Sequence, residues 1–300
     1  MTPPSQAQYP GVDRRRDLSP QEFAERYVSQ NRPVVLEGAA RGWAERWTPS
    51  MLKERFGDRT IAVESNHHSV IDIRKTQLPL RRFLEMAEAS SLEYRFRSID
   101  FTDTFPELES ELAADAYFAS YFPTSKRRRT HAFWVSPSGN YTSLHHDAHL
   151  DNLNVQVFGS KTFVLIAPSQ HPFISPFALF ESPVNPFWPD HARFPKFAQA
   201  KVQEAVLKPG DMLFVPRYWW HSVAALSLSI NINTWSMAED ARSWSTLAGV
   251  PFGERLLLTL NEKLGVSDRF PSIETVVIRL AGKRPAPSPL KGPDPATRSR

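Results

Sequence analysis

The stretch that decides the fold is Thr142–Asp147, which reads Thr-Ser-Leu-His-His-Asp. It contains a His-x-Asp pair, His145 and Asp147. Residues two apart on a β-strand point to the same face of the sheet, so these two side chains could bind one metal ion together. A third ligand, His221, ends the sequence Tyr-Trp-Trp-His further along the chain. The stretch therefore predicts a metal site carried on β-strands.

A His-x-Asp pair is a weak signal by itself, and the chain contains a second one, His149 and Asp151. The first pair is the better candidate because it follows a turn inside a strand-like segment, whereas Asp151 directly precedes an expected strand at Asn152. Two histidines and one carboxylate on one side of a metal ion form the facial triad of non-haem iron(II) oxygenases, which leaves positions open for a co-substrate and O2. Spacing alone supports ordinary core or surface histidines equally well.

Short strands separated by turn residues are expected on both sides of this stretch, from about residue 131 to 235. In 152–157 and 227–235 the residues alternate, with Leu, Ile and Val on one face and Asn, Gln and Ser on the other. This succession predicts a β-sandwich or barrel. The polar face could line a ligand-holding interior or face solvent, and the expected metal residues favour the interior.

The first third of the chain reads as mixed α and β. A capping box at Ser19–Glu22, with Pro20 at the first helical position, begins a helix that runs to about Ser29. Helices are expected again after Trp235. We therefore expect a flexible leader at 1–17, one folded domain at 18–236 with its core at 130–236, C-terminal helices within 237–281 (at 238–247, 252–264 and 273–280), and a disordered tail at 282–300.

Composition excludes several classes of protein. Hydrophobic residues make up 41% of the 300 residues, enough for one large or two small cores. The chain has no cysteine, which excludes a disulfide scaffold, a thiolate zinc site and a cysteine nucleophile. No apolar run approaches the roughly 20 residues needed to cross a bilayer, and 1–16 lack the apolar core of a signal peptide. We expect no membrane partner and a cytoplasmic location.

Part of the net charge of +4 lies in short basic runs, such as Arg14–Arg16 and 126–129. Such runs can bind an acidic partner or nucleic acid. No helix-turn-helix, zinc-finger or RNA-binding signature accompanies them, however. Solvated loops and tails explain the runs better, and we expect no nucleic-acid partner.

From about Ser19 to Trp235 the sequence resembles the JmjC-type, cupin-fold 2-oxoglutarate oxygenases, in particular the asparaginyl hydroxylase of hypoxia-inducible factor and its bacterial cupin-like relatives. The resemblance implies a mainly β fold, with a double-stranded β-helix (jelly-roll) core, an α/β N-terminal part and C-terminal helices. It also implies Fe(II) as the metal and 2-oxoglutarate as the co-substrate. The matching stretches follow one another in the same order at similar separations: 31–38, 142–147, 152–161, 208–221 and 233–235.

The same resemblance assigns roles to single residues. It implies that His145, Asp147 and His221 are the iron ligands and the catalytic centre. Lys161 matches the lysine that pairs with the distal carboxylate of 2-oxoglutarate. Thr142 matches a hydroxyl that donates a hydrogen bond to the same carboxylate. Taken alone, Lys161 and Thr142 would be an ordinary surface lysine and an ordinary strand residue.

Three further residues are implied to line the co-substrate site: Tyr94, Asn152 and Asn233. Without the resemblance, the two asparagines could equally cap strand ends. One departure from the family pattern concerns Asn152, which lies five residues after Asp147 where the family has four. We expect the extra residue to form a β-bulge, and His149 within it to reach the substrate entrance.

The implied reaction is the hydroxylation of an unactivated C–H bond with O2. A protein or peptide side chain is the first choice of substrate, because the resembling proteins are protein hydroxylases. A small molecule, such as an amino acid or a natural-product intermediate, is the alternative. Two other functions remain open: a cupin-like binding protein without catalysis, and a metal-dependent cupin that uses no 2-oxoglutarate.

Two elements outside the core carry further expectations. The Pro- and aromatic-rich segment 168–198 could form a lid over the site, or its aromatic side chains could anchor a long loop to the barrel, and the second interpretation is favoured. The C-terminal helices resemble a dimerisation element, so we expect a homodimer through them.

Overall fold

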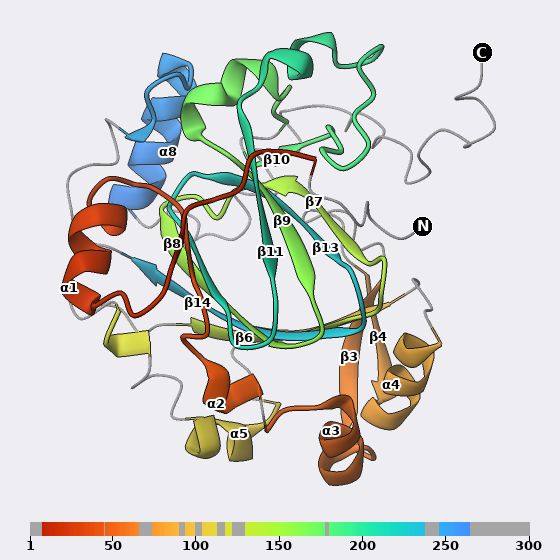
Figure 1. Ribbon diagram of the computed structural model, residues 1–300. Coiled ribbons are helices and arrows are strands. Elements are labelled where there is room, and N and C mark those ends of the chain that lie inside the picture. The colour runs from red at the N-terminus through yellow and green to blue at the C-terminus, as the bar shows by residue number, and fades with distance from the viewer. Residues whose placement is uncertain are drawn as a thin grey trace.

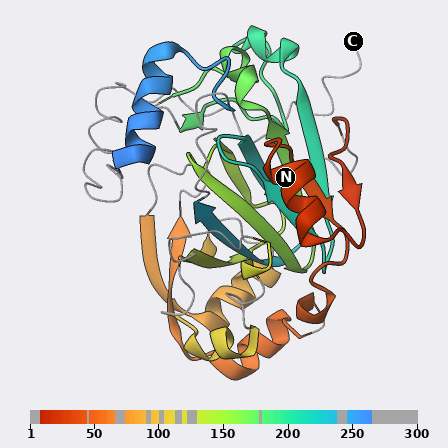
Figure 2. The ribbon, with the colours of Figure 1, turned by 90° about the vertical axis from the view of Figure 1, so that its left-hand side faces the viewer.

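Two β-sheets pack against each other and form the body of the protein in the computed structural model (Figure 1). Helices cover the molecule at opposite ends, with α3 and α4 at one end and α8 at the other (Figures 1 and 2). The structure describes residues 8–44, 46–65, 74–89, 94–99, 104–112, 118–121, 130–177, 180–237 and 246–264.

The larger sheet has nine strands in the order β1-β2-β12-β8-β14-β6-β5-β3-β4, and the smaller has five in the order β10-β7-β13-β9-β11. The larger sheet consists of β1 Arg14–Arg15, β2 Val34–Leu36, β3 Thr60–Ser65, β4 Arg74–Pro79, β5 Arg95–Ile99, β6 Thr130–Ser136, β8 Leu150–Phe158, β12 Met212–Val215 and β14 Ser229–Met237. The smaller sheet consists of β7 Tyr141–His145, β9 Lys161–Ile166, β10 Glu181–Ser182, β11 Val202–Leu207 and β13 Trp220–Ala225.

From β6 onward the chain alternates between the two sheets. It passes from β6 to β7, back to β8, across to β9 and later from β11 to β12, β13 and β14. Strands far apart in the sequence therefore become neighbours: β8 lies between β12 and β14, and β13 lies between β7 and β9. This is the double-stranded β-helix, and the predicted mainly β fold class is confirmed.

The polar faces of β8 and β14 point into the space between the sheets. Asn152 and Asn233 lie on these two strands, and the Asn233 amide donates to Asn152 at 3.0 Å. Lys161, at the start of β9, donates across the interior to Asn231 of the opposite sheet. The apolar faces of the same strands, including Leu153, pack outward into the largest hydrophobic cluster. The interior interpretation of the polar face is confirmed.

A tight turn fixes the start of β9. Gly159, between β8 and β9, has φ +65°, and a Cβ built there would lie 2.0 Å from the Leu228 carbonyl oxygen. Only glycine fits that backbone position without displacement. The turn is followed directly by Lys161, whose side chain is buried in the interior. The turn thus determines where the lysine enters the barrel.

Helices of the N-terminal part cover the outer face of the larger sheet. The predicted capping box at Ser19 is present, with the Ser19 hydroxyl accepting from the Glu22 backbone and the Glu22 carboxylate accepting from the Ser19 backbone. Phe23 and Leu52 from these helices are fully buried in the largest cluster. The helices are α1 Pro20–Phe23, continued as a π-helix at Ala24–Val28, α2 Arg41–Ala44, α3 Pro49–Phe56, α4 Leu80–Glu88 and α5 Pro106–Leu112.

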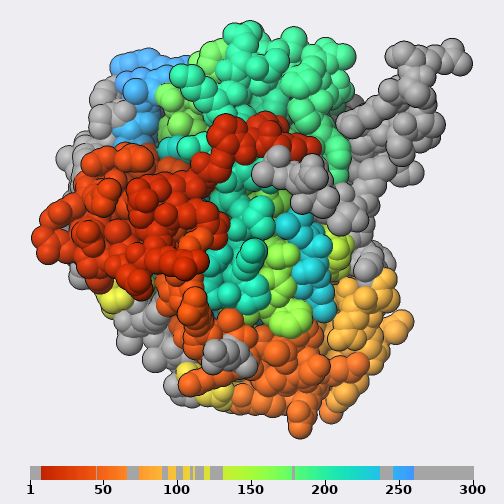
Figure 3. Space-filling view, viewed as in Figure 1, coloured from red at the N-terminus to blue at the C-terminus, as the bar shows by residue number. Residues whose placement is uncertain are grey.

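Residues 8–17 differ from the flexible leader that the sequence predicts. The backbone N–H groups of Gln8 and Tyr9 donate to the Glu204 carboxylate, and β1 pairs in parallel with β2. Val12 is buried between the two sheets. In Figure 3 this segment, coloured red, lies across the surface of the teal strands. Residues 1–7 lie outside the described residues.

The C-terminal region is described in part. Helix α8, Phe252–Leu264, agrees with the helix predicted at 252–264. The other two predicted helices lie wholly or mostly outside the described residues, and so does the predicted disordered tail, so these predictions and that of a dimer through the helices stay predictions. Among the described residues, none of the helices combines the length and apolar character that crossing a membrane requires.

Candidate metal centre

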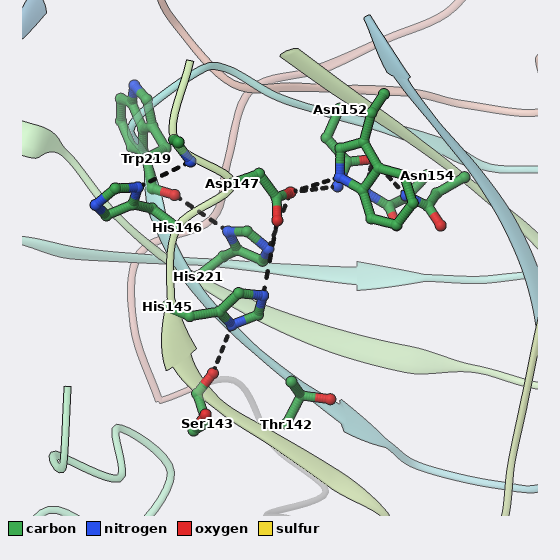
Figure 4. Close-up of polar contacts among 12 residues, drawn as sticks. Thr142, Ser143, His145, His146, Asp147, Asn152, Asn154, Trp219 and His221 are labelled. Atoms are coloured by element: carbon green, nitrogen blue, oxygen red, sulfur yellow. Dashed lines mark hydrogen bonds and ion pairs between the residues drawn. The ribbon is translucent and has the colours of Figure 1, made fainter. Parts of the chain in front are cut away.

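Three side chains converge where β7 and β13 lie side by side (Figure 4). One ligand atom from each of His145, Asp147 and His221 lies within 4.8 Å of the other two. The Asp147 carboxylate oxygens are 3.9 Å from His145 Nε2 and 3.7 Å from His221 Nε2. These separations exceed hydrogen-bond length, and an ion between the three groups could contact all of them. The predicted metal triad is present.

The register of the strands brings the two histidines together. His145 and His221 are direct partners in the β7–β13 ladder, and their ring centroids are 4.3 Å apart. The pairing shifts by one residue immediately after His221. Such an irregularity turns a strand locally and re-aims its side chains. The metal site is therefore built at the end of β7, where the ladder breaks.

The sequence suggested that Asp147 and His145 share one face of a strand, but they do not. Strand β7 ends at His145, and Asp147 lies in the turn that carries the chain to β8, next to Ala148 with φ +50°. Strand β10 pairs with the end of β7, and the backbone N–H of His146 still donates to the Phe180 carbonyl at 3.1 Å. The carboxylate thus reaches the site from a turn. This turn, and not strand alternation, brings the two residues of the His-x-Asp pair to one site.

Backbone carbonyls orient both imidazoles. His145 Nδ1 donates to the Ser143 carbonyl at 2.8 Å, and His221 Nδ1 donates to the Trp219 carbonyl at 3.1 Å (Figure 4). A carbonyl can only accept, so each Nδ1 carries a proton, and Nε2 is the ring atom of each histidine that could bind a metal. Burial, followed by the nearby His221, lowers the pKa of His145 to about 3. His145 is therefore neutral near pH 7, as a metal ligand must be.

Two donors hold one oxygen of the Asp147 carboxylate. Asn152 Nδ2 donates to Oδ2 at 2.7 Å, and Trp235 Nε1 donates to the same oxygen at 3.0 Å. Burial alone raises the pKa of Asp147, but the neighbouring histidines and these two hydrogen bonds bring it below its ordinary value. The carboxylate is therefore ionised and fixed in direction. Trp235 was not predicted to take part in the site.

Lys161 lies on β9 and Thr142 on β7, and β13 separates these two strands in the smaller sheet. Lys161 is 4% exposed, and burial, followed by the charge of Arg95, lowers its pKa to about 7. Thr142 Oγ1 accepts a hydrogen bond of 2.7 Å from Arg95. The structure thus places both predicted co-substrate residues at the interior, together with an arginine that was not predicted.

Tyr94 is the third residue for which a co-substrate role is predicted. It directly precedes β5 and packs against the largest hydrophobic cluster, while the next residue, Arg95, points into the interior and contacts Thr142. Successive side chains of a strand point to opposite faces, so a shift of one position along the strand changes which side chain points into the interior. The role predicted for Tyr94 stays a prediction, and Arg95 is a further residue of the interior that was not predicted. The alternation of Arg95 and Arg97 around the buried Phe96 was the signal that could have identified it.

In the second His-x-Asp pair, His149 and Asp151, the aspartate takes part in a buried ion pair. Asp151 Oδ2 accepts from the Arg217 guanidinium at 3.0 Å, and both side chains are buried. The extra residue before Asn152 lies in the turn at 146–149, and no bulge interrupts the pairing of β8 with β14 from Asn231 to Met237. The predicted β-bulge is therefore wrong, while the Asn152 side chain still reaches Asp147.

The aromatic segment at 168–198 is anchored to the barrel. Phe177, Phe187 and Phe194 are all buried, and the last two pack with Leu144 in a cluster on the outer face of the smaller sheet. The segment forms two 3-10 helices, at Pro168–Phe173 and Pro195–Gln199. The interpretation that these aromatic side chains anchor the loop is supported.

A family model described as "Cupin-like domain" matches residues 20–241. Lysine-specific demethylase 8 of Xenopus tropicalis is 28% identical over 225 residues, covering 72% of this chain and 50% of the relative. tRNA wybutosine-synthesizing protein 5 of Danio rerio is 27% identical over 288 residues, covering 85% of each. The human bifunctional peptidase and (3S)-lysyl hydroxylase JMJD7 is 25% identical over 258 residues, covering 72% of this chain and 81% of the relative. The chain spans about half the length of the first of these relatives.

Proposed function

The chain belongs to the cupin-like family, as a relative of the JmjC proteins, and from this premise we propose that it is an Fe(II)- and 2-oxoglutarate-dependent oxygenase. The single observation that carries the proposal is the triad of His145, Asp147 and His221, whose ligand atoms lie within 4.8 Å of one another. Two imidazoles and one carboxylate are the donor set of a facial iron(II) site. The donor set therefore fits the metal.

The residues of the interior fit the co-substrate as well. Lys161 is buried, and its side-chain partner among the described residues, Asn231, is neutral. A buried cation is stabilised by an anionic partner, and the distal carboxylate of 2-oxoglutarate would supply one. The bound iron and 2-oxoglutarate would together activate O2, yielding succinate, CO2 and one oxygen atom for the substrate.

The protein's own residues would position and shield this chemistry. His145 and His221 present their Nε2 lone pairs because their Nδ1 atoms are held by backbone carbonyls. Asn152 and Trp235 keep the Asp147 carboxylate from rotating. His221 is 4% exposed, so little bulk water reaches this ligand. A fixed and dry ligand set is what such an oxidation requires.

For the substrate we propose a protein or peptide side chain that is hydroxylated at a C–H bond. The support is that two of the relatives above are, by name, a lysine-specific demethylase and a lysyl hydroxylase. The third acts, by name, in tRNA wybutosine synthesis. A mass gain of one oxygen atom in proteolytic peptides incubated with the enzyme would support a peptide substrate. Modification of free amino acids alone would favour a small molecule, and release of formaldehyde would indicate demethylation.

The test of the proposed function is an anaerobic titration with Fe(II) and 2-oxoglutarate, followed by the weak visible charge-transfer band of the chelate. The wild type should show the band. His221→Ala and Lys161→Ala should lose or weaken it, while exposed controls, His191→Ala and Lys208→Ala, should keep it. Iron binding without the band would instead favour a metal-dependent cupin that uses no 2-oxoglutarate. Absence of iron binding would favour the non-catalytic binding protein.

A further inference from the structure

Arg95 crosses the interior of the barrel from one sheet to the other. It starts on β5 of the larger sheet, and its NH1 group donates to Thr142 Oγ1 on β7 of the smaller sheet at 2.7 Å. Its Nε donates to Glu64 Oε2 at 3.0 Å. The guanidinium lies 5.3 Å from the centre of the Trp134 ring. Arg95 is 1% exposed, so water does not supply further partners from bulk solvent.

One nitrogen of this guanidinium has no hydrogen-bond partner among the residues that the structure describes. Arg95 NH2 is fully buried and makes no hydrogen bond within the described part of the chain. A buried donor without an acceptor costs free energy, about 1–3 kcal/mol and more for a charged group. Native proteins leave few such groups, and those that remain call for an explanation. An acceptor from a ligand would supply the missing hydrogen bond.

The charges around Arg95 specify what that acceptor should be. Glu64 is the carboxylate beside Arg95, and it also pairs with Arg97 at 2.7 Å. One acidic group is therefore shared between two arginines. Lys161 is a further buried basic group, whose pKa is lowered by its burial and then by the charge of Arg95. This part of the interior carries an excess of positive charge, which favours an anionic ligand.

We infer that Arg95 binds the distal carboxylate of 2-oxoglutarate together with Lys161 and Thr142, and that it selects 2-oxo acids that carry this second carboxylate. This inference rests on the proposed function and goes beyond it, because it assigns the selectivity to a residue for which the family resemblance provided Tyr94. A guanidinium offers two parallel N–H donors to a carboxylate, and charged hydrogen bonds of this kind are stronger than neutral ones.

The competing explanation is that Arg95 only supports Glu64 and Thr142. Arg97 is the matched control for this alternative. It bonds the same Glu64 carboxylate, and its guanidinium lies 5.3 Å from the same Trp134 ring, as that of Arg95 does. It makes no recorded contact with Thr142. If support of Glu64 were what matters, removing either arginine should have the same effect.

The test compares two ligands that differ only at the far end. 2-Oxoglutarate and 2-oxopentanoate share the five-carbon chain and the 2-oxo acid group, but 2-oxopentanoate has a methyl group in place of the distal carboxylate. Their dissociation constants are measured by calorimetry on Mn(II)-loaded protein, which binds ligand without turnover. The quantity of interest is the selectivity, the ratio of the two dissociation constants. Wild type, Arg95→Met and Arg97→Met are compared after thermal melts show that each is folded.

The wild type should bind 2-oxoglutarate much more tightly than 2-oxopentanoate. Arg95→Met should reduce this selectivity about tenfold or more, by weakening 2-oxoglutarate while leaving 2-oxopentanoate within about twofold. Arg97→Met should leave both constants within about twofold. If Arg95→Met does not fold, Arg95→Gln removes the charge while keeping a donor for Thr142, and the same loss of selectivity is expected.

The possible negative results distinguish an error in this inference from an error in the proposed function. Equal weakening of both ligands in the Arg95 variants, or unchanged selectivity, would overturn this inference and leave the proposed function intact, because the wild type would still bind 2-oxoglutarate. The same loss of selectivity in Arg97→Met would also overturn it. A wild type that binds Mn(II) but neither acid would overturn the proposed function first, and this inference with it.

Discussion

Replacing Trp235 by Phe tests whether the neighbours of the metal ligands set the affinity for the metal. The indole N–H donates to Asp147 Oδ2 at 3.0 Å, and Phe keeps the ring packing while removing the donor. A hydrogen bond to a charged group contributes about 1.5–3 kcal/mol, which corresponds to about 10- to 150-fold in a dissociation constant. Asn152 still donates to the same oxygen at 2.7 Å, so the lower end applies. We expect about a tenfold weaker binding of the metal.

The assay is an anaerobic competition between the protein and a coloured chelator for Fe(II), repeated with Mn(II). The control is Trp219→Phe, which removes an indole donor bonded to the Asn31 carbonyl at 2.9 Å, away from the carboxylate. The control should bind the metal within about twofold of the wild type. The reasoning is refuted if Trp235→Phe binds as tightly as the wild type while remaining folded. It is also refuted if both variants lose the same affinity.

Three further predictions concern the co-substrate site and stability. Burial and the charge of Arg95 lower the pKa of Lys161 to about 7. A bound carboxylate restores the ammonium form, so binding of 2-oxoglutarate should be accompanied by uptake of about 0.9 proton at pH 8 and about 0.1 at pH 6. Calorimetry in buffers of different ionisation heat measures this uptake, and no uptake at pH 8 would contradict the prediction. Arg217→Met should lower the free energy of unfolding by about 3–5 kcal/mol in urea titrations, because it leaves Asp151 buried without its ion-pair partner. The control Arg193→Met, at an exposed position, should change this free energy by less than about 0.5 kcal/mol. The same loss in both variants would count against the argument. Ser19→Ala should cost about 1 kcal/mol in the same titrations by removing the cap of α1, and no loss would show that the capping box adds nothing.

Local patterns predicted short strands in a β-sandwich or barrel, whereas the metal triad was decided by the family resemblance and not by spacing alone. Strict alternation in 152–157 and 227–235 records which side chains share a face, and the pairing of Asn152 and Asn233 across β8 and β14 follows from it. The strand-end position of the histidines also follows from short strands broken by turns. What alternation does not record is the phase of an isolated strand, so it did not place Arg95 in the interior.

The missing information lies in contacts between distant parts of the chain. The phase of β5 is determined by Glu64 and Thr142, which are 31 and 47 residues away from Arg95 in sequence. The order of residues 8–17 depends on Glu204, which is 196 residues from Gln8. The polar, Pro-rich composition of the N-terminal segment is the same whether or not such an acceptor exists. Local composition therefore could not identify either feature.

A chain of hydrogen bonds joins the metal ligands to the cations at the far end of the interior. Asn152 donates to Asp147 and accepts from Asn233 at 3.0 Å, and Asn233 accepts from the indole of Trp134. The Trp134 ring in turn lies beside the guanidinium of Arg95. The links between the two charged ends are neutral amides and an aromatic ring. Under the proposed function, a ligand held between these two ends would carry a chelating group at one end, a carboxylate at the other and an uncharged middle, which is the chemical form of 2-oxoglutarate.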